Sequence, residues 1–453
     1  MTSVTNTERI SKQADHSKNN DADSLLDTYN DHNRYRIALY YCYIDIENVS
    51  EHVNFHRSLC EENGLMGRIR VSREGINGVL SGRLSVLQDY EEKLRAELTR
   101  LHPNSDDNDD LGEFDVKYCH LRPDLPVKTQ LFDSLMCKET SAVVSLFDPD
   151  HNTERNEKKK GYSKMSNRRR RRQQQRHAQK ELLEEALPCN LRELAQKVPS
   201  MPGARHLSPE EWNEKLLNTE DAVLLDCRNV YESNVGYFST DKAPTLLTNT
   251  RKYSDLPKVL AQSKDQWAHK KQIFMYCTGG VRCEVASKFV QALVEEENTD
   301  GQGEVEIYQL HGGIQRYLEN YHTNEALVQH DKEQQIPEGH EKGPCLYRGK
   351  NFVFDPRRTD PMLDITNEKA VVGKCCICQK PHDDYDNGHA PLEEKEARCC
   401  KCRILLLVCD ACRPTVQCWG EDHKHDLPKL YCGKEACNDY QVTGENPASF
   451  AQV

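Results

Sequence analysis

The chain has 453 residues, a length that predicts about three domains, and a formal net charge of −12 at pH 7. This acidic balance excludes a protein that binds nucleic acid over its whole surface, so any RNA site has to be local. The N-terminus lacks the apolar stretch of a secretory signal, and the longest aliphatic run, Ile404–Val408, is too short to span a bilayer. We therefore expect a cytoplasmic protein that does not enter a membrane.

The first third of the chain predicts an α+β domain behind a polar leader. Residues 1–33 contain almost no large apolar side chain, and we expect a disordered leader there. The following domain, residues 34–148, has the hydrophobic periodicity of strands at 35–43, 65–71, 76–81 and 114–119 and of helices at 47–63 and 84–101. The order βαββαβ predicts a ferredoxin-like fold, with two helices on one face of an antiparallel sheet.

The composition changes abruptly between residues 149 and 203, which we expect to be a linker. Lysines and arginines crowd residues 158–180, interleaved with Asn, Gln and Ser. Three interpretations of this basic run stay open: a solvated run of charge, a nuclear-localisation signal, and an arm that neutralises RNA phosphates. The second interpretation would add a nuclear location to the cytoplasmic one.

Residues 204–325 alternate strands and helices, the pattern of an α/β domain with a parallel sheet, and the expected strands are 223–226, 273–276 and 305–308. The stretch Lys271–Val290, KQIFMYCTGGVRCEVASKFV, places an apolar strand, two glycines and an amphipathic helix in succession. Cys277 ends the strand and therefore lies at a helix N-terminus, where unpaired backbone N–H groups stabilise an anion.

Cys277 has the surroundings of a nucleophile. The helix N-terminus and the nearby cation of Arg282 should lower its pKa below the value of about 8.5 of a free thiol. A cysteine at the end of an apolar strand is most often a buried core residue, but a core residue needs no glycine-rich loop of N–H donors behind it. The Cys-x4-Arg spacing closes a ring one residue smaller than the phosphate loop of tyrosine phosphatases, which suits a single sulfur atom. We therefore interpret Cys277 as the nucleophile.

The segment YCTGGVRCE resembles the active-site loop of rhodanese-like domains, in the version carried by the tRNA uridine hydroxylase family and by eukaryotic rhodanese domain-containing proteins of this type. LLDCRNVYESNVGYF at 224–238 resembles that family's second signature, although Tyr237 stands where the family has His. The resemblance implies that Cys277 and Arg282 are catalytic. The other site residues that it implies are the loop residues Thr278, Gly279, Gly280, Val281 and Cys283 and the supporting residues Asp226 and Arg228.

The family that the loop resembles carries a ferredoxin-like domain before its rhodanese domain. Residues 74–78, EGING, resemble an element of that domain, although a short Gly/Asn stretch is equally typical of a plain turn. On the functional interpretation, Glu74 and Asn77 contact RNA together with Lys138, which otherwise lies on a solvated strand edge. Residues 326–370 resemble the family's post-rhodanese segment, which packs back on the core.

Residues 371–453 hold eleven of the twenty cysteines, and in a chain without a secretory signal this predicts metal binding rather than disulfides. Four cysteine pairs supply enough thiolates for two tetrahedral, structural zinc sites. The sequence does not choose between consecutive and cross-braced pairing, and adjacent cysteines leave the ligand register open by one. The expected ligands are Cys375, Cys378, Cys399, Cys402, Cys409, Cys412, Cys432 and Cys437. The spare residues are Cys376, Cys400, Cys418, His423 and His425.

The resemblance implies a tRNA-modifying enzyme that converts the wobble uridine to 5-hydroxyuridine with molecular oxygen as co-substrate. In a consistent hypothesis the Cys277 thiolate adds to C6 of uridine, and the resulting enolate reacts with oxygen at C5. The alternative is a sulfurtransferase in which Cys277 carries sulfur as a persulfide, but this activity needs neither the EGING domain nor a basic arm. A third hypothesis, a scaffold whose zinc module binds a protein partner, is weakened by the intact Cys277 and Arg282.

Overall fold

The computed structural model describes residues 32–101, 114–121, 126–147, 191–297, 305–321, 344–352, 359–360, 371–385, 397–421 and 424–432. Residues 1–31 of the expected leader, the basic run 158–180, His423 and Cys437 lie outside the described residues. The chain divides into two compact units. The first comprises Met1–Tyr40, Asn48–Arg70 and Gly78–Lys138, and the second comprises Tyr41–Glu47, Val71–Asn77 and Glu139–Val453.

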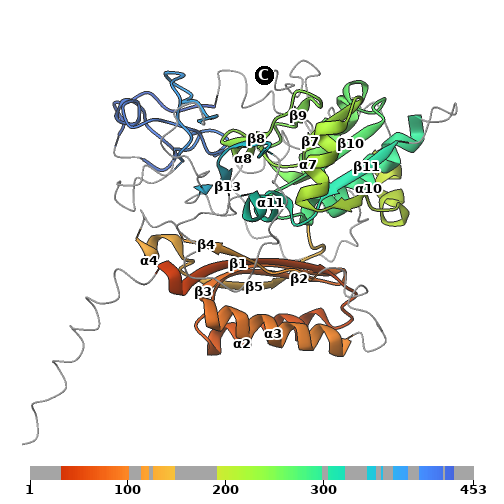
Figure 1. The fold of residues 1–453 in the computed structure, drawn as a ribbon. Coiled ribbons are helices and arrows are strands. Elements are labelled where there is room, and N and C mark those ends of the chain that lie inside the picture. The colour runs from red at the N-terminus through yellow and green to blue at the C-terminus, as the bar shows by residue number, and fades with distance from the viewer. Residues whose placement is uncertain are drawn as a thin grey trace, which may run out of the picture. The chain divides into compact units, whose positions relative to one another are not determined.

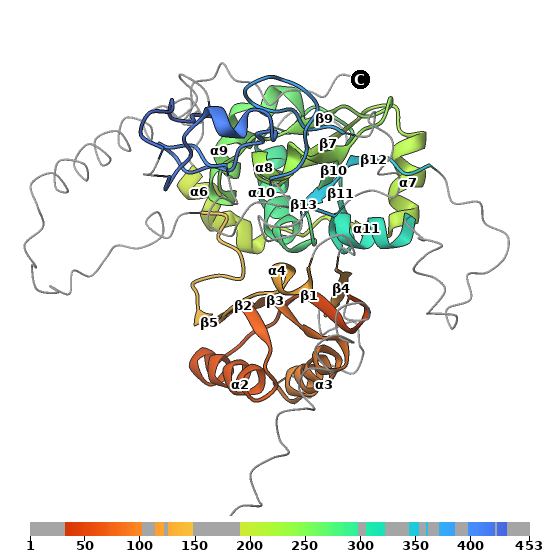
Figure 2. The same ribbon diagram turned by 90° about the vertical axis from the view of Figure 1, so that its left-hand side faces the viewer.

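The N-terminal part of the chain has the expected ferredoxin-like arrangement. Its strands are β1 (Tyr35–Tyr43), β2 (Met66–Ser72), β3 (Gly75–Arg83), β4 (Lys117–His120) and β5 (Leu135–Glu139). They form one sheet in the order β4-β1-β3-β2-β5, in which β1 and β4 are antiparallel. The helices are α2 (Val49–Glu62), α3 (Leu84–Leu101) and the short α4 (Val127–Gln130). Both α2 and α3 bury apolar side chains at helical spacing, which is how a helix packs on a sheet. The two helices cover the same face of the sheet (Figures 1 and 2).

The second unit contains the expected parallel sheet. Its strands are β6 (Arg205–Leu207), β7 (Ala222–Asp226), β9 (Thr245–Leu247), β10 (Gln272–Tyr276) and β11 (Glu306–Leu310). Their order is β6-β11-β10-β7-β9, and all neighbouring pairs are parallel. The helices are α7 (Pro209–Asn218), α8 (Val230–Ser233), α9 (Leu256–Gln262), α10 (Val281–Glu297) and α11 (Gly313–Tyr321), with 3-10 turns η3 (Tyr253–Asp255) and η4 (Lys264–Gln266).

Side chains alternate between the two faces of this sheet. Ile273 and Met275 of β10 belong to a buried cluster with Phe289 of α10, whereas Phe274 belongs with Trp212 of α7 to a second cluster. Parallel sheets that are covered on both faces carry their ligand sites at the carboxyl ends of their strands. The loop after β10, the central strand, is therefore placed where an active site is expected.

The linker expected at residues 149–203 is too long at its C-terminal end, because residues 191–200 are part of the folded domain. Leu191–Lys197 forms α6 and Val198–Ser200 forms the 3-10 turn η2. Leu194 and Val198 are buried in the same cluster as α10. These apolar side chains make the segment part of the α/β domain, although it follows the basic run closely in the sequence.

The C-terminal segments pack on the same unit. The remaining strands are β8 (Gly236–Phe238), β12 (Tyr347–Gly349), β13 (Asn351–Phe352) and β14 (Thr359–Asp360), paired antiparallel as β8 with β12 and β13 with β14. The described Cys-rich segment is mostly irregular, with isolated bridges and the 3-10 turn η7 (Arg413–Thr415). Leu405 of this segment is buried in one cluster with Val235 and Phe352, so hydrophobic contacts fix the segment to the α/β domain.

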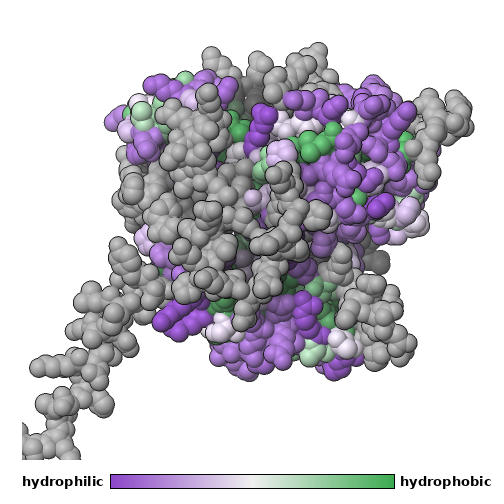
Figure 3. Space-filling model, in the orientation of Figure 1, coloured by the Kyte–Doolittle hydropathy of each residue, from purple (hydrophilic) through white to green (hydrophobic). Residues whose placement is uncertain are grey.

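The hydrophobic side chains of the described residues lie mainly in these cores. On the face drawn in Figure 3, the coloured surface is mostly hydrophilic, with hydrophobic side chains in small groups. Among the described residues, no helix combines the length and the apolar character that crossing a membrane requires.

Candidate active site and metal centre

Cys277 directly follows β10 and precedes the turn that opens α10. Gly280 in this turn has a φ of +97°, a conformation that favours glycine. The Gly280 N–H donates to Cys277 Sγ at 3.2 Å. The loop therefore directs a backbone donor at a single, fully buried sulfur atom beside a helix N-terminus.

The surroundings of this sulfur favour its anionic form. Burial alone would raise the pKa of Cys277. A hydrogen bond with the Cys283 thiol, the charge of Arg282 and the backbone N–H groups of these two residues lower the pKa further than burial raises it, to about 6. A thiol of this pKa is roughly nine-tenths ionised at pH 7. Cys277 is therefore mainly a thiolate at neutral pH.

Arg282 forms a buried ion pair in addition to acting on the sulfur. Its two terminal nitrogens donate to the two carboxylate oxygens of Glu232 at 2.7 Å each. Nη2 also donates to Thr278 Oγ1 at 2.9 Å, and the Thr278 hydroxyl donates to Glu232 at 2.9 Å. Burial would raise the pKa of Glu232, but the charge of Arg282 outweighs burial and lowers it. Arg282 thus holds the loop that follows β10 to α8.

The turn after β11 supports the loop through its backbone. The Ile314 N–H donates to the Cys277 carbonyl oxygen at 3.0 Å, and the Gln315 N–H donates to that of Thr278 at 3.0 Å. Gly313 has a φ of +66°, and a Cβ there would lie 2.6 Å from the Cys277 carbonyl oxygen and 2.7 Å from that of Thr278. Glycine at this position therefore allows the start of α11 to approach the loop this closely.

Two tyrosines at the carboxyl end of β1 belong to the same unit and contact the first turn of α10. The Tyr41 hydroxyl donates to Glu284 Oε1 at 3.0 Å, and the Tyr43 hydroxyl donates to the Val281 carbonyl oxygen at 3.3 Å. His206 Nε2 lies 2.9 Å from the same Glu284 oxygen. Burial, and then the charge of Glu284, raise the pKa of Tyr41, so its hydroxyl remains a proton donor beside the loop.

Cys283 lies in the first turns of α10 and is fully buried. Burial, followed by hydrogen bonds with Cys227 and Cys277, raises the pKa of Cys283 well above its ordinary value. Cys283 therefore stays a protonated thiol beside the Cys277 thiolate. The role of Cys283 as a site residue stays a prediction.

Asp226 and Arg228 form a fully buried ion pair at the end of β7. Arg228 Nη2 donates to Asp226 Oδ2 at 2.7 Å and to the Gly236 carbonyl oxygen at 2.6 Å. The Tyr276 hydroxyl donates to the same carboxylate oxygen of Asp226 at 3.0 Å. Because Tyr276 directly precedes Cys277, this pair supports the strand end from which the loop begins.

The three candidate RNA contacts differ in their surroundings. Glu74 accepts a hydrogen bond from the Val143 N–H at 2.7 Å, and Asn77 Nδ2 donates to the Val143 carbonyl oxygen at 3.3 Å. These two side chains therefore hold the segment after β5. Their hydrogen bonds occupy polar atoms that an RNA contact would also need. Lys138 is exposed on β5. An RNA contact stays a prediction for all three residues.

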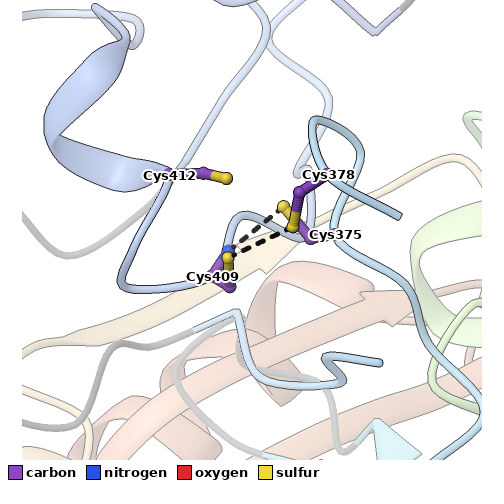
Figure 4. A group of neighbouring side chains, drawn as sticks. All are labelled: Cys375, Cys378, Cys409 and Cys412. Atoms are coloured by element: carbon purple, nitrogen blue, oxygen red, sulfur yellow. Dashed lines mark hydrogen bonds between the residues drawn. The ribbon is translucent and has the colours of Figure 1, made fainter. Parts of the chain in front are cut away.

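Cys375, Cys378, Cys409 and Cys412 form one group of four sulfurs (Figure 4). The four Sγ atoms all lie within 4.8 Å of one another, and those of Cys378 and Cys409 are 3.6 Å apart. Zn–S bonds of about 2.3 Å in a tetrahedron place sulfurs about 3.8 Å apart, so the group has dimensions that suit a metal of this kind. The first and third cysteine pairs of the sequence thus come together.

Cys399, Cys402 and Cys432 form a second group, whose Sγ atoms also lie within 4.8 Å of one another. Cys402 and Cys432 Sγ are 3.6 Å apart, and Arg251 Nη2 donates to Cys432 Sγ at 3.5 Å. The second pair therefore meets a member of the fourth pair, and the arrangement is cross-braced. Cys437, the other member of the fourth pair, lies outside the described residues.

The structure also separates the cysteines that are adjacent in the sequence. In the part of the chain that the structure describes, Cys376 and Cys400 belong to neither sulfur group. The Cys400 thiol donates to the Gln417 carbonyl oxygen at 3.2 Å, and Cys418 Sγ accepts a hydrogen bond from Arg413. Cys400 and Cys418 therefore have hydrogen-bond partners other than a metal.

Comparison with known proteins agrees with this architecture. The UPF0176 acylphosphatase like domain matches residues 35–140, and the rhodanese-like domain matches residues 209–320. A tRNA uridine(34) hydroxylase of Streptococcus suis is 30% identical over 372 residues, which cover 82% of this chain and 83% of that protein. The chain belongs to the tRNA uridine(34) hydroxylase family.

Other relatives extend the comparison. A tRNA uridine(34) hydroxylase of Chlamydia pneumoniae is 27% identical over 392 residues, covering 86% of this chain and 87% of that protein. The rhodanese-like domain-containing protein 6 of Arabidopsis thaliana is 29% identical over 391 residues, covering 84% of this chain. The chain spans only about half of this plant relative, 51% of its length.

Sequence analysis of this tRNA uridine(34) hydroxylase family member did not single out Glu232, Tyr41 or Glu284. A sequence signal for Glu232 exists, because a Glu three residues after an N-cap Asn is the pattern of a capping box. In the structure the Glu232 carboxylate accepts the Asn229 N–H at 3.1 Å. Tyr41 has no such local signal, since its hydrogen bond to Glu284 joins residues 243 positions apart.

Proposed function

We propose that this protein hydroxylates the wobble uridine of tRNA at C5, with Cys277 as the nucleophile and molecular oxygen as co-substrate. Membership of a family whose relatives are named tRNA uridine(34) hydroxylase supports the reaction and the substrate. The observation that carries the proposal is the Cys277 thiol, whose pKa of about 6 makes it an anionic nucleophile at neutral pH.

The reaction begins when the Cys277 thiolate adds to C6 of uridine, and the electron pair of the C5–C6 double bond becomes an enolate. C5 of this enolate attacks oxygen and, after taking up a proton, becomes a hydroperoxide. Two electrons and two protons from a thiol reductant convert the hydroperoxide to a C5 hydroxyl and one water. Loss of the C5 proton and departure of the Cys277 thiolate from C6 restore the double bond and the free enzyme.

The groups around the loop supply the other requirements of this reaction. The Tyr41 hydroxyl and the Glu284 carboxylate, 3.0 Å apart, provide a proton donor and a proton acceptor beside the first turn of α10. Arg282 and Glu232 form a paired, nearly neutral brace that keeps the loop in place while charge moves between sulfur and substrate. This bracing role supports the proposal that Arg282 is a site residue.

The uracil base of the substrate has to displace side chains to reach the Cys277 sulfur, because Cys277 is fully buried. The Tyr253 hydroxyl donates to the Arg282 carbonyl oxygen at 2.5 Å, and the Tyr41 hydroxyl would lie 2.7 Å from a Cβ on Gly280. We propose that these two tyrosines frame the entry to the loop, where aromatic rings can stack on the uracil ring.

We also propose that the two sulfur groups hold structural zinc. The first supplies Cys375, Cys378, Cys409 and Cys412 as four thiolates, the donor set that zinc prefers, and for the second we propose Cys437 as the ligand that joins Cys399, Cys402 and Cys432. Bound zinc would fix the irregular Cys-rich segment and contribute directly to its folding. Thiolate sites and a tRNA substrate both fit the reducing cytoplasm, where we place the reaction.

Mass spectrometry of tRNA nucleosides tests the proposed function. Cells that lack the protein are rescued with the wild type, with Cys277→Ser, or with the control Cys345→Ser, whose thiol lies outside the loop. We expect 5-hydroxyuridine derivatives to return with the wild type and the control only, and to carry label from 18O-enriched oxygen gas. If their level does not depend on the protein, sulfurtransferase activity becomes the leading function, and transfer of sulfur from thiosulfate to cyanide is the assay.

A further inference from the structure

Two aromatic side chains of the Cys-rich segment are exposed. Trp419 is 46% exposed and Tyr431 is 48% exposed, and no other aromatic side chain stands among the exposed large hydrophobic residues of the described chain. The tryptophans outside this segment, Trp212 and Trp267, are fully buried. Exposed aromatic rings on this segment point to a ligand that packs on flat apolar faces.

A backbone bridge joins the two segments that carry these rings. Gln417 and Lys429 form a parallel bridge, in which the Leu430 N–H donates to the Gln417 carbonyl oxygen at 2.8 Å. Trp419 and Tyr431 each lie two residues beyond this bridge, one in each of the segments that it joins. Cys432, a member of the second sulfur group, follows Tyr431 directly.

Cations accompany these rings. The Arg403 guanidinium lies over the Trp419 ring, 4.9 Å from its centroid, and both Arg403 and Lys429 are exposed. Of the acidic residues nearby, Glu421 is buried in ion pairs with Arg413 and Lys424, so its charge is compensated.

Asp426 is the other described acidic residue between Trp419 and Tyr431, and it is exposed. It lies on the turn before Lys429, whereas the guanidinium of Arg403 covers the Trp419 ring itself. Trp419, Tyr431, Arg403 and Lys429, called the aromatic patch below, thus combine two exposed aromatic rings with two exposed cations in a chain of net charge −12.

We propose that the aromatic patch binds unpaired bases of the tRNA substrate, with Trp419 and Tyr431 stacking on two bases and Arg403 and Lys429 contacting the adjoining phosphates. Aromatic rings with flanking cations are the means by which proteins bind single-stranded nucleic acid. The wobble uridine belongs to an anticodon loop whose bases are unpaired and available for stacking. This inference rests on the proposed function for the identity of the RNA.

Intrinsic fluorescence provides a direct test, because Trp419 is the exposed tryptophan of a chain that has three. The full-length, zinc-loaded protein is titrated with an anticodon stem-loop RNA that carries an unmodified wobble uridine. We expect this RNA to quench the fluorescence, and we expect no quenching in Trp419→Phe. A duplex of the same stem without the loop should leave the fluorescence unchanged, and equal quenching by that duplex would overturn the stacking of unpaired bases.

Affinity measurements complete the test. Trp419→Ala and Tyr431→Ala should each weaken stem-loop binding about 5- to 150-fold, the equivalent of the ~1–3 kcal/mol that one base–aromatic stack contributes. Leu217→Ala, which removes a 38% exposed side chain on α7, is the control and should bind normally. Zinc content is measured for each variant to verify that the Cys-rich segment remains folded.

The outcomes separate this inference from the proposed function. If Trp419→Ala and Tyr431→Ala keep wild-type affinity, the aromatic patch does not bind RNA, even when Cys277→Ser has abolished hydroxylation. If these variants bind RNA normally but lose a co-purifying protein, the patch binds a protein partner and the inference is wrong. If Cys277→Ser still hydroxylates tRNA, the proposed catalytic mechanism fails, whereas quenching of Trp419 fluorescence is unaffected.

Discussion

Replacing Arg282 by glutamine tests the electrostatic account of the active-site loop. The substitution keeps most of the side-chain volume but removes the charge that pairs with Glu232. The two side chains are 12% and 7% exposed, so Glu232 would be left as a buried, unpaired carboxylate. Removing one partner of a buried pair destabilises proteins by about 3–5 kcal/mol, and we expect a loss of about 3 kcal/mol here.

The same substitution should change the titration of Cys277. The charge of Arg282 is one of the causes that lower the pKa of Cys277 to about 6, so its loss should raise this pKa toward that of a free thiol. A rise of about one unit would reduce the thiolate fraction at pH 7 from roughly nine-tenths to about one half. The backbone N–H groups remain, so we expect the pKa to stay below that of a free thiol.

The pH dependence of the stability loss has a definite sign. Pairing lowers the pKa of Glu232 in the folded state, so its stabilising contribution is present above the unfolded pKa and is lost as the pH falls through the folded value. The difference in unfolding free energy between the wild type and Arg282→Gln should therefore be largest at neutral pH and should shrink in acid.

Denaturant unfolding and the ultraviolet absorbance of the thiolate measure these two effects. Arg316→Gln is the matched control, because its ion pair with Glu319 is about one-third exposed and should contribute less than about 1 kcal/mol. The double variant Glu232→Gln/Arg282→Gln should recover part of the stability, since no charge is left unpaired. If Arg282→Gln unfolds like the wild type and leaves the titration of Cys277 unchanged, the buried pair does not hold the loop.

Three further predictions concern the same unit. The thiolate absorbance that Cys277→Ser removes should rise with pH around a midpoint near 6, and a midpoint near 9 would contradict the account of the loop. Gly313→Ala should lower stability by about 2 kcal/mol or more in denaturant unfolding, since its Cβ would meet loop carbonyl oxygens at a positive φ, whereas Gly203→Ala, with nothing within 4 Å, should change it by less than about 0.5 kcal/mol. Metal analysis should find two zinc ions per chain, and about one in Cys409→Ser; an unchanged zinc content would exclude the first sulfur group as a zinc site.

Local sequence patterns predict the elements of this fold where periodicity is strong. The strand predicted at residues 35–43 and the helix predicted at 84–101 have the bounds of β1 and α3, because alternation and helical spacing are unbroken there. The segment that forms α6 was assigned to the linker instead. It has only seven residues, and the buried Leu194 together with Val198 of the adjoining η2 gives too short a pattern to outweigh the neighbouring basic composition.

The site divides in the same way between local and distant contacts. The loop from Cys277 to Arg282 is contiguous, so its glycines, its helix and its cation are visible in the sequence. The partner of Arg282 lies 50 positions away in Glu232, and the cross-braced pairing of the sulfurs depends on how irregular segments pack. Spacing alone supplies the number of thiolates but leaves their partners open, because both pairings satisfy the same motif.

A thiolate in a loop of N–H donors serves a sulfurtransferase as well as a uridine hydroxylase, so Cys277 alone does not separate the two. The difference lies in the protons. Sulfur transfer moves a sulfur atom from a donor to an acceptor without removing a proton from carbon, whereas hydroxylation has to remove the C5 proton after oxygen has been added. Tyr41 and Glu284 provide a proton donor and acceptor beside the loop, and Tyr41 comes from β1, the first strand of the ferredoxin-like sheet. A rhodanese domain on its own would lack this tyrosine, so the N-terminal strand has a chemical reason to accompany Cys277 in a hydroxylase.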